Sequence, residues 1–135
     1  MERNTSRPSG PLDELRRTLI WFAADDARHR LFVLTGRGTF SAAQIFLNQI
    51  DHDTPAIVAG EPSSSRPDFP GEDTSLRLPW SGIHGSITSR WHMVDGADTR
   101  TWIAPRIPVR LISRDYFANR DPVLEAVLEV MRKEQ

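Results

Sequence analysis

Apolar positions along the first half of the chain change their period several times. Over residues 12–24 they recur every three or four positions, which predicts a helix with one apolar face. Residues 31–34 form a short continuous apolar run, which is typical of a buried strand. Helical spacing returns from Ser41 and stops at the polar segment 51–55, and a second buried run follows at 56–59. A strand, a glycine turn, a helix and a strand predict a βαβ unit in a parallel sheet.

The second half of the chain has weaker patterns and more proline. Residues 61–73 and 94–101 are polar and are expected to be loops. Between them, 76–78 and 83–87 predict a β-hairpin, and 107–111 predicts an edge strand because Pro108 cannot donate to a ladder. Asp121 before Pro122 predicts the start of a final helix. We therefore expect an α/β domain over residues 11–135, preceded by a disordered tail at 1–10.

Composition narrows the function classes. The chain has 135 residues, which favours one domain, and its formal net charge of −1 argues against a nucleic acid or an anionic membrane as partner. It has no cysteine, so thiol catalysis, disulfides and thiolate metal sites are excluded. No cofactor is expected. Residues 1–10 lack an apolar signal segment and no run is long enough to span a membrane, so the sequence as it stands predicts a cytoplasmic protein.

Ser41 stands where the predicted glycine turn meets the predicted helix. At a helix N-terminus, free backbone N–H groups and the helix dipole can stabilise an oxyanion that develops beside the serine hydroxyl. The N–H of Ala42 is the natural first donor, and small residues at 42 and 43 leave room for a substrate carbonyl. From spacing alone, however, a serine at this place is more often a simple N-cap. The segment also differs from the Gly-x-Ser-x-Gly elbow of the α/β-hydrolases.

Four segments, in order, resemble tail-specific (C-terminal processing) serine peptidases. They are 31–44, LFVLTGRGTFSAAQ; 56–62, AIVAGEP; 102–109, WIAPRIPV; and 115–126, DYFANRDPVLEA. The resemblance covers about residues 12 to 131 and corresponds to the C-terminal part of the family's catalytic domain. It implies part of a crotonase-like spiral core, as in Clp-type proteases. It also implies that Ser41 is the acyl-enzyme nucleophile, with the Ala42 amide in the oxyanion hole, and members of this family are often extracytoplasmic.

The chain departs from the family's Ser–Lys branch at one important position. The loop after Gly60-Glu61-Pro62 carries Arg66 where that branch has its lysine, and arginine stays protonated, so it cannot act as a general base. Lys133, near the C-terminus, is the only lysine in the sequence. The family's upstream Gly-rich segment, which supplies the other oxyanion donor, has no counterpart before residue 12. The base is therefore expected from a second chain or a missing upstream segment. Arg66 itself could bind a peptide carboxylate or be a solvated loop residue.

Other candidate residues have milder interpretations. Asp51, His52 and Asp53 could orient a base or hold a metal, but a solvated helix end is favoured and no metal site is expected. His84 and His92 could supply a base, although partly exposed strand histidines are the favoured interpretation. Three tryptophans could line a groove, but aromatic side chains that cover the edges of the core are favoured: Trp80, Trp91 and Trp102. The wide apolar stripes of the first and last helices predict self-association or a missing partner.

Three functions remain open from the sequence. The leading one is a serine-type peptidase domain that acts through Ser41 on peptide or protein substrates and is incomplete as an isolated chain. The second is a non-catalytic ligand- or protein-binding module on the same scaffold. The repeats of interphotoreceptor retinoid-binding protein resemble this scaffold and are used for binding alone. The third is a degenerate remnant without independent function.

Overall fold

The computed structural model describes residues 10–25 and 29–134, so the expected tail at 1–10 lies outside the described residues except for Gly10. The chain folds into helices and two small sheets, and its first four elements alternate between helix and strand, which confirms the α/β class. In chain order the elements are α1 (Pro11–Ala23), β1 (Phe32–Thr35), α2 (Ala42–Asp53), β2 (Ile57–Gly60), β3 (Phe69–Arg77), β4 (His84–His92), β5 (Ile107–Pro108), α3 (Ser113–Phe117) and α4 (Pro122–Lys133).

The predicted βαβ unit is present. β1 and β2 are parallel neighbours, in a register that pairs Phe32 with Ile57 and Thr35 with Gly60, and α2 connects them. β5 joins the other side of β2, also in parallel, to give the strand order β1-β2-β5. The expected edge strand is thus confirmed, although it is only two residues long.

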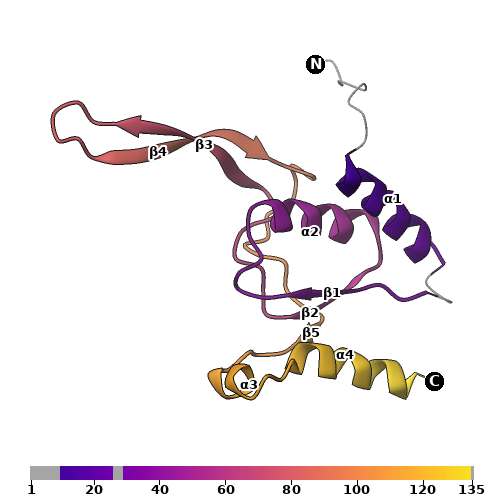
Figure 1. Cartoon of the computed structure of the whole chain (residues 1–135). Coiled ribbons are helices and arrows are strands. Elements are labelled where there is room, and N and C mark those ends of the chain that lie inside the picture. The colour runs from indigo at the N-terminus through magenta and orange to yellow at the C-terminus, as the bar shows by residue number, and fades with distance from the viewer. Residues whose placement is uncertain (1–9, 26–28, 135) are drawn as a thin grey trace.

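The small sheet lies between two helical layers (Figure 1). α1 and α2 pack together on one side of it, and α3 and α4 lie on the other. Since β2 runs through the middle of the sheet, all four of its residues are buried. The core joins the inner face of α2, β2 and the segment before β5, through Leu47, Val58 and Ile103.

Helix α2 buries a more polar face than the pattern predicts. Leu47 and Ile50 are buried as expected, but Ala43 is exposed, whereas Gln44 and Asn48 are fully or almost fully buried. The final helix begins as predicted, since Asp121 Oδ1 accepts hydrogen bonds from the next two free amides of α4 at 3.1 and 2.9 Å. The short helix α3 is not foreseen in the sequence.

The hairpin is much longer than the sequence pattern indicates. β3 starts at Phe69, so the last part of the expected loop at 61–73 is strand, and each hairpin strand has nine residues. β3 and β4 pair with each other in antiparallel fashion and extend away from the rest of the molecule (Figure 1). Both faces are therefore mostly in solvent. The alternation that normally marks a half-buried strand is missing for this reason.

The expectation that the tryptophans cover core edges is wrong. Trp80 at the hairpin tip is 100% exposed, Trp91 is 56% exposed and Trp102 is 49% exposed. On α4 only Val127 is buried, and the rest of the apolar stripe stays in contact with solvent. The last helix therefore has bare apolar surface, the feature from which self-association or a missing partner is predicted. Among the described residues, no helix is long and apolar enough to cross a membrane.

Candidate active site

A tight turn carries the chain from the end of β1 to Ser41. The Thr39 amide donates to the Gly36 carbonyl at 2.9 Å, and the Gly36 amide donates to Thr39 Oγ1 at 3.1 Å. These two bonds close the turn over residues 36–39 before α2 begins at Ala42. The turn therefore holds Ser41 at the junction between a parallel strand and a helix, as the sequence predicts.

Ser41 has a backbone conformation that serine rarely adopts. Its φ is 56° and its ψ is −122°, the values of the first central residue of a type II′ turn, a position dominated by glycine. For a residue with a Cβ atom, such a conformation costs about 1–3 kcal/mol. Strain of this kind persists only when the surrounding structure imposes it, and it is concentrated at functional sites.

The hydroxyl of Ser41 does not cap helix α2. Ser41 occupies the N-cap position, but its side chain makes no capping hydrogen bond, and the residue is exposed. The N-cap interpretation, which spacing alone favours, is therefore wrong for the side chain. The Ser41 carbonyl does join the helix, since it accepts from the Ile45 amide at 3.0 Å. The hydroxyl is left available to a ligand or substrate.

The first turn of α2 offers a free backbone donor in the residue next to Ser41. The Ala43 amide is used, because it donates to the Phe40 carbonyl at 3.2 Å. Across the described residues, no backbone hydrogen bond uses the Ala42 amide, and Ala42 is an exposed residue. A free N–H at the positive end of a helix is suited to a developing negative charge.

The loop that follows β2 packs directly against the turn that precedes Ser41. The Ser64 amide and the Ser64 hydroxyl both donate to the Thr39 carbonyl, at 3.2 and 2.9 Å. At the end of β1, Thr35 Oγ1 donates to the Glu61 carbonyl at 2.8 Å. Loop 61–66 and turn 36–40 therefore form one hydrogen-bonded unit, although both α2 and β2 lie between them in the chain.

An ion pair reinforces this unit. Arg37 donates from Nε and Nη2 to the two carboxylate oxygens of Glu61, at 3.0 and 2.7 Å. The hydrogen bonds and charge of Arg37 lower the pKa of Glu61, and Glu61 in turn raises the pKa of Arg37. Beside the pair is a shallow pocket of 310 Å³, and its lining residues are Arg37, Glu61, Pro62, Ser63, Ser64 and Trp102. This pair is not predicted from the sequence, although the sequence shows an arginine within the glycine turn and a glutamate after β2.

Arg66 lies at the far end of the same loop. Arg66 is exposed and forms no ion pair with the described residues. The pKa of Asp98 is lowered mainly by its hydrogen bonds with Arg100, and the charge of Arg66 lowers it to a smaller extent. The next residue, Pro67, accepts a hydrogen bond from the Asn48 side chain, two turns into α2. The structure does not bring Arg66 into hydrogen-bonding contact with Ser41.

Asp51, His52 and Asp53 are divided among different partners. Asp51 accepts from Arg100 at 2.7 Å, whereas Asp53 accepts from Arg16 on α1 at 2.6 Å. His52 Nδ1 lies 2.9 Å from Asp53 Oδ1, and this hydrogen bond raises the pKa of His52. Over residues 10–25 and 29–134, no group of three or more acidic or imidazole side chains could hold a metal ion. These residues therefore act mainly in ion pairs that join α2 to α1 and to the loop before residue 102.

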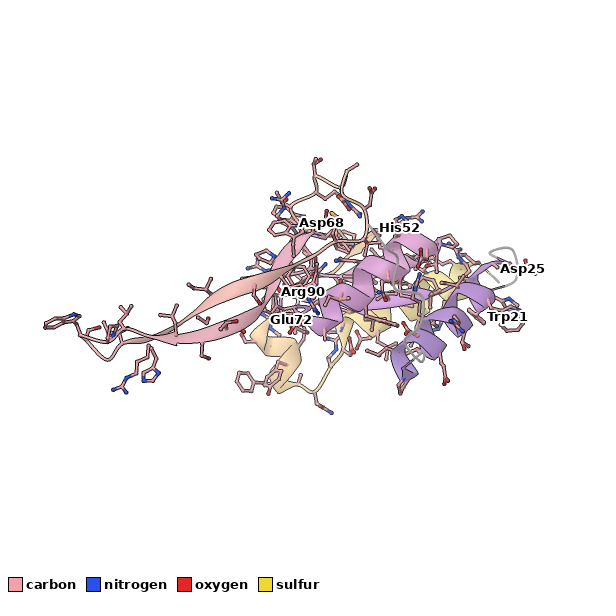
Figure 2. All side chains as sticks on the ribbon, turned by 90° about the horizontal axis from the view of Figure 1, so that it is seen from above. Trp21, Asp25, His52, Asp68, Glu72 and Arg90 are labelled. Carbon is pink, nitrogen blue, oxygen red and sulfur yellow. The ribbon has the colours of Figure 1, made fainter. Side chains whose placement is uncertain are left out.

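The two strand histidines differ in their surroundings. His84 is exposed at the tip end of β4, as expected. His92 is half-buried at the other end of β4: its ring centroid is 5.4 Å from that of Phe69, and its Nε2 is 3.8 Å from a carboxylate oxygen of Glu72. Phe69 in turn contacts Phe40, the residue before Ser41, with 6.1 Å between ring centroids. Figure 2 shows Glu72 at the root of the hairpin, beside the body of the molecule.

Two buried side-chain amides on α2, which the sequence does not predict, connect this helix to the loop. Gln44 Nε2 donates to Asn48 Oδ1 at 2.7 Å, and Asn48 donates to the Pro67 carbonyl. Gln44 Oε1 is buried without a partner among the described residues. Polar residues four apart inside an otherwise apolar helical stripe were the available signal. Because Asn48 holds Pro67, the pair fixes the end of loop 61–67 against α2.

Comparison with known families gives no match to this chain. Comparison with curated proteins gives none either. The site must therefore be interpreted from its own geometry.

Proposed function

We propose that this chain is a serine-peptidase-type domain that transfers an acyl group to Ser41, on a partial crotonase-like core. The observation that carries the proposal is the conformation of Ser41: a strained φ of 56° together with a hydroxyl that caps nothing. A structural serine at a helix start would relax and donate or accept locally. A strained backbone and a side-chain hydroxyl without a local hydrogen bond are consistent with a serine that is held in place to attack a substrate.

The chemistry follows from the groups around Ser41. Its Oγ attacks a carbonyl carbon, a base removes the hydroxyl proton, and the new C–O bond converts the carbonyl oxygen into an oxyanion. The free Ala42 amide and the N-terminal end of α2 stabilise that charge. Collapse of this intermediate breaks the C–N bond, and the amine leaves with a proton from the protonated base. Water then hydrolyses the acyl-enzyme.

The general base must come from outside the groups that now touch Ser41. Arg66 cannot serve, since a guanidinium stays protonated. The proposal therefore includes a second chain or an upstream segment that supplies the base and the second oxyanion donor. Two features support the peptidase scaffold: loop 61–66 is bound to the turn of the nucleophile, and the 102–109 segment continues into β5 beside β2.

Arg66 is proposed to bind the substrate. It is exposed and unpaired among the described residues, on a loop whose other end touches the Ser41 turn. A guanidinium binds a carboxylate through two parallel hydrogen bonds. The substrate class that fits is a peptide or protein chain with a free C-terminal or acidic carboxylate near the bond that is cut.

A second candidate function is a non-catalytic binding module on the same scaffold. The observation in its favour is that, across residues 10–25 and 29–134, no hydrogen bond joins Ser41 Oγ to a histidine, lysine or carboxylate. A Ser41→Ala variant that retains every activity of the wild-type protein would support this function. Loss of activity in Ser41→Ala, with its fold intact, would support the peptidase.

A serine-directed fluorophosphonate tests the main proposal. We expect the folded wild-type chain to form an adduct at Ser41, and we expect Ser41→Ala to lose that adduct. Ser64→Ala is the matched control, because Ser64 is also exposed and lies next to the same turn. An absence of labelling at Ser41 in the folded chain, with a base-supplying upstream segment added as well as without it, would overturn the proposal.

A further inference from the structure

The hairpin formed by β3 and β4 ends in a hydrogen-bonded loop that exposes a tryptophan to solvent. The Leu78 amide donates to the Ile83 carbonyl at 2.9 Å and the Gly82 amide donates to the Leu78 carbonyl at 2.9 Å, so the loop is closed by its own backbone. Trp80, between them, is 100% exposed, and Ile83 is 62% exposed. A preformed loop binds at a lower entropic cost than a mobile one.

The hairpin has no cover within its own chain. β3 and β4 pack almost entirely against each other, and both views show the arm extending away from the body (Figure 1 and Figure 2). A two-stranded hairpin alone in water is marginally stable. Ile87 and Trp91 on β4 are also more than half exposed. Because they are four residues apart on one strand, Ile87 and Trp91 lie on the same face of β4, and uncovered apolar side chains gathered on one face indicate an interaction surface.

The same chain carries a pocket whose chemistry matches this tip. The pocket has a volume of 560 Å³ and lies where α3 leads into α4, between Leu111, Phe117 and Val123. Phe117 is 83% exposed, and its ring meets that of Tyr116 edge to face, with 5.5 Å between the centroids. An open aromatic pocket of this size suits a large aromatic side chain.

Charge also favours this pairing. Arg77 and His84 are cross-strand neighbours just behind the tip, so the tip has a basic flank. Arg120 and Asp121 both line the pocket. Arg120 is already paired with Glu125 at 2.6 Å, and Asp121 caps α4 through Oδ1 alone, which leaves its second carboxylate oxygen for a partner. The rim of the pocket is thus able to accept a basic partner.

The tip cannot enter its own pocket. In Figure 1 the hairpin leaves the molecule on the side of α1 and α2, whereas α3 and α4 lie on the other side of the sheet. We propose that the hairpin tip of one copy, led by Trp80, docks into the α3–α4 pocket of a second copy. The contact joins two different surfaces of the same chain, so it is heterologous.

Sedimentation velocity of the full chain over a range of concentrations tests this proposal. We expect concentration-dependent self-association that Trp80→Ser and Phe117→Ser each weaken about tenfold or more, the size of a buried aromatic anchor. Trp21→Ser is the matched control, because Trp21 is 76% exposed on α1, on the opposite side of the molecule from the hairpin tip (Figure 2), and it should change nothing. Circular dichroism verifies that all variants remain folded.

A mixing experiment distinguishes this contact from any other. The Trp80→Ser copy keeps its pocket and the Phe117→Ser copy keeps its tip, so an equimolar mixture should associate more strongly than either variant alone. A wild-type chain that stays monomeric would overturn the proposal. A monomer that bound anionic lipid vesicles through Trp80 would overturn it as well, because the tip would then have a different partner. It would also be overturned if Phe117→Ser associated like the wild type.

Discussion

Arg37 and Glu61 hold each other through two parallel hydrogen bonds, across the junction between the Ser41 turn and the loop after β2. Neither residue forms a hydrogen bond with the hydroxyl of Ser41. Together with the Ser64 hydroxyl on the Thr39 carbonyl, the pair fixes the two segments that surround the proposed nucleophile. The geometry of the site thus depends on contacts between residues more than twenty positions apart.

Glu61→Gln should remove a pH-dependent part of the stability. Arg37 lowers the pKa of Glu61 below its ordinary value of 4.5, so the ion pair stabilises the folded state above that pH and is lost as pH falls through the lower folded value. The free energy of unfolding, from urea titrations, should therefore differ between wild type and variant at neutral pH, and the difference should shrink in acid. Glu14→Gln on α1 is the control, and a pH-independent difference for Glu61→Gln would contradict this account.

Gly60→Ala should be strongly destabilising. Gly60 has a φ of +117°, and a Cβ atom there would lie 2.1 Å from the carbonyl oxygen of Thr35 on the paired strand. Since backbone atoms cannot move away cheaply, we expect a loss of more than about 3 kcal/mol in the free energy of unfolding. Gly36→Ala is the matched control, because nothing lies within 4 Å of its added methyl group. Equal effects of the two variants in thermal unfolding would show that the close approach is absent.

Asn48→Ala should loosen the loop that flanks the site. The substitution leaves the Pro67 carbonyl and the Gln44 amide buried without their partner, which costs about 1–3 kcal/mol. Hydrogen exchange should increase in residues 61–68. As a comparison on the same helix, Gln49→Ala removes a side chain that is only partly buried, and it should leave this exchange unchanged. Unchanged exchange in Asn48→Ala would argue against a role for the pair in holding the loop.

Substitutions of Ser41 should separate strain from capping. Glycine adopts the observed φ and ψ without strain, so Ser41→Gly should raise the free energy of unfolding by about 1 kcal/mol after its own entropic cost. Ser41→Ala keeps the strain and loses no capping bond, so it should be neutral within about 0.5 kcal/mol. If the Ser41 hydroxyl capped α2, Ser41→Ala would instead lower the free energy of unfolding by about 1 kcal/mol. Chemical denaturation of the three proteins decides between these results.

The parts of the fold with strong local patterns could be predicted. Buried runs at 31–34 and 56–59 identified the parallel strands because both faces of such strands are covered. The Asp121-Pro122 signal located the start of α4 because capping depends on neighbouring residues only. The hairpin was underestimated because its strands are solvated on both faces, which removes the alternating pattern. Trp80 was placed at the core for a related reason: sequence does not show whether an apolar side chain finds cover.

The candidate site could be predicted only in part. Position 41 follows from a local strand–turn–helix pattern, but that pattern also fits a capping serine. The positive φ of Ser41 has no local signal in the sequence, and the turn before it is held by a hydrogen bond from the loop at 61–66, which is distant in the chain. The partners of Asp51 and Asp53 are likewise on distant segments. For this reason the sequence alone could not decide whether that trio holds a ligand or joins helices.

The most direct test of the central claim is the distribution of a fluorophosphonate label among the serines of one folded chain. Peptide mapping by mass spectrometry would measure the adduct at Ser41 beside those at other exposed serines such as Ser64 and Ser86. We predict that Ser41 carries most of the label in the folded protein, and that this preference disappears in urea, where the turn and the free Ala42 amide are lost. Equal labelling of all exposed serines in the folded state, or labelling that avoids Ser41, would contradict the assignment of Ser41 as a nucleophile.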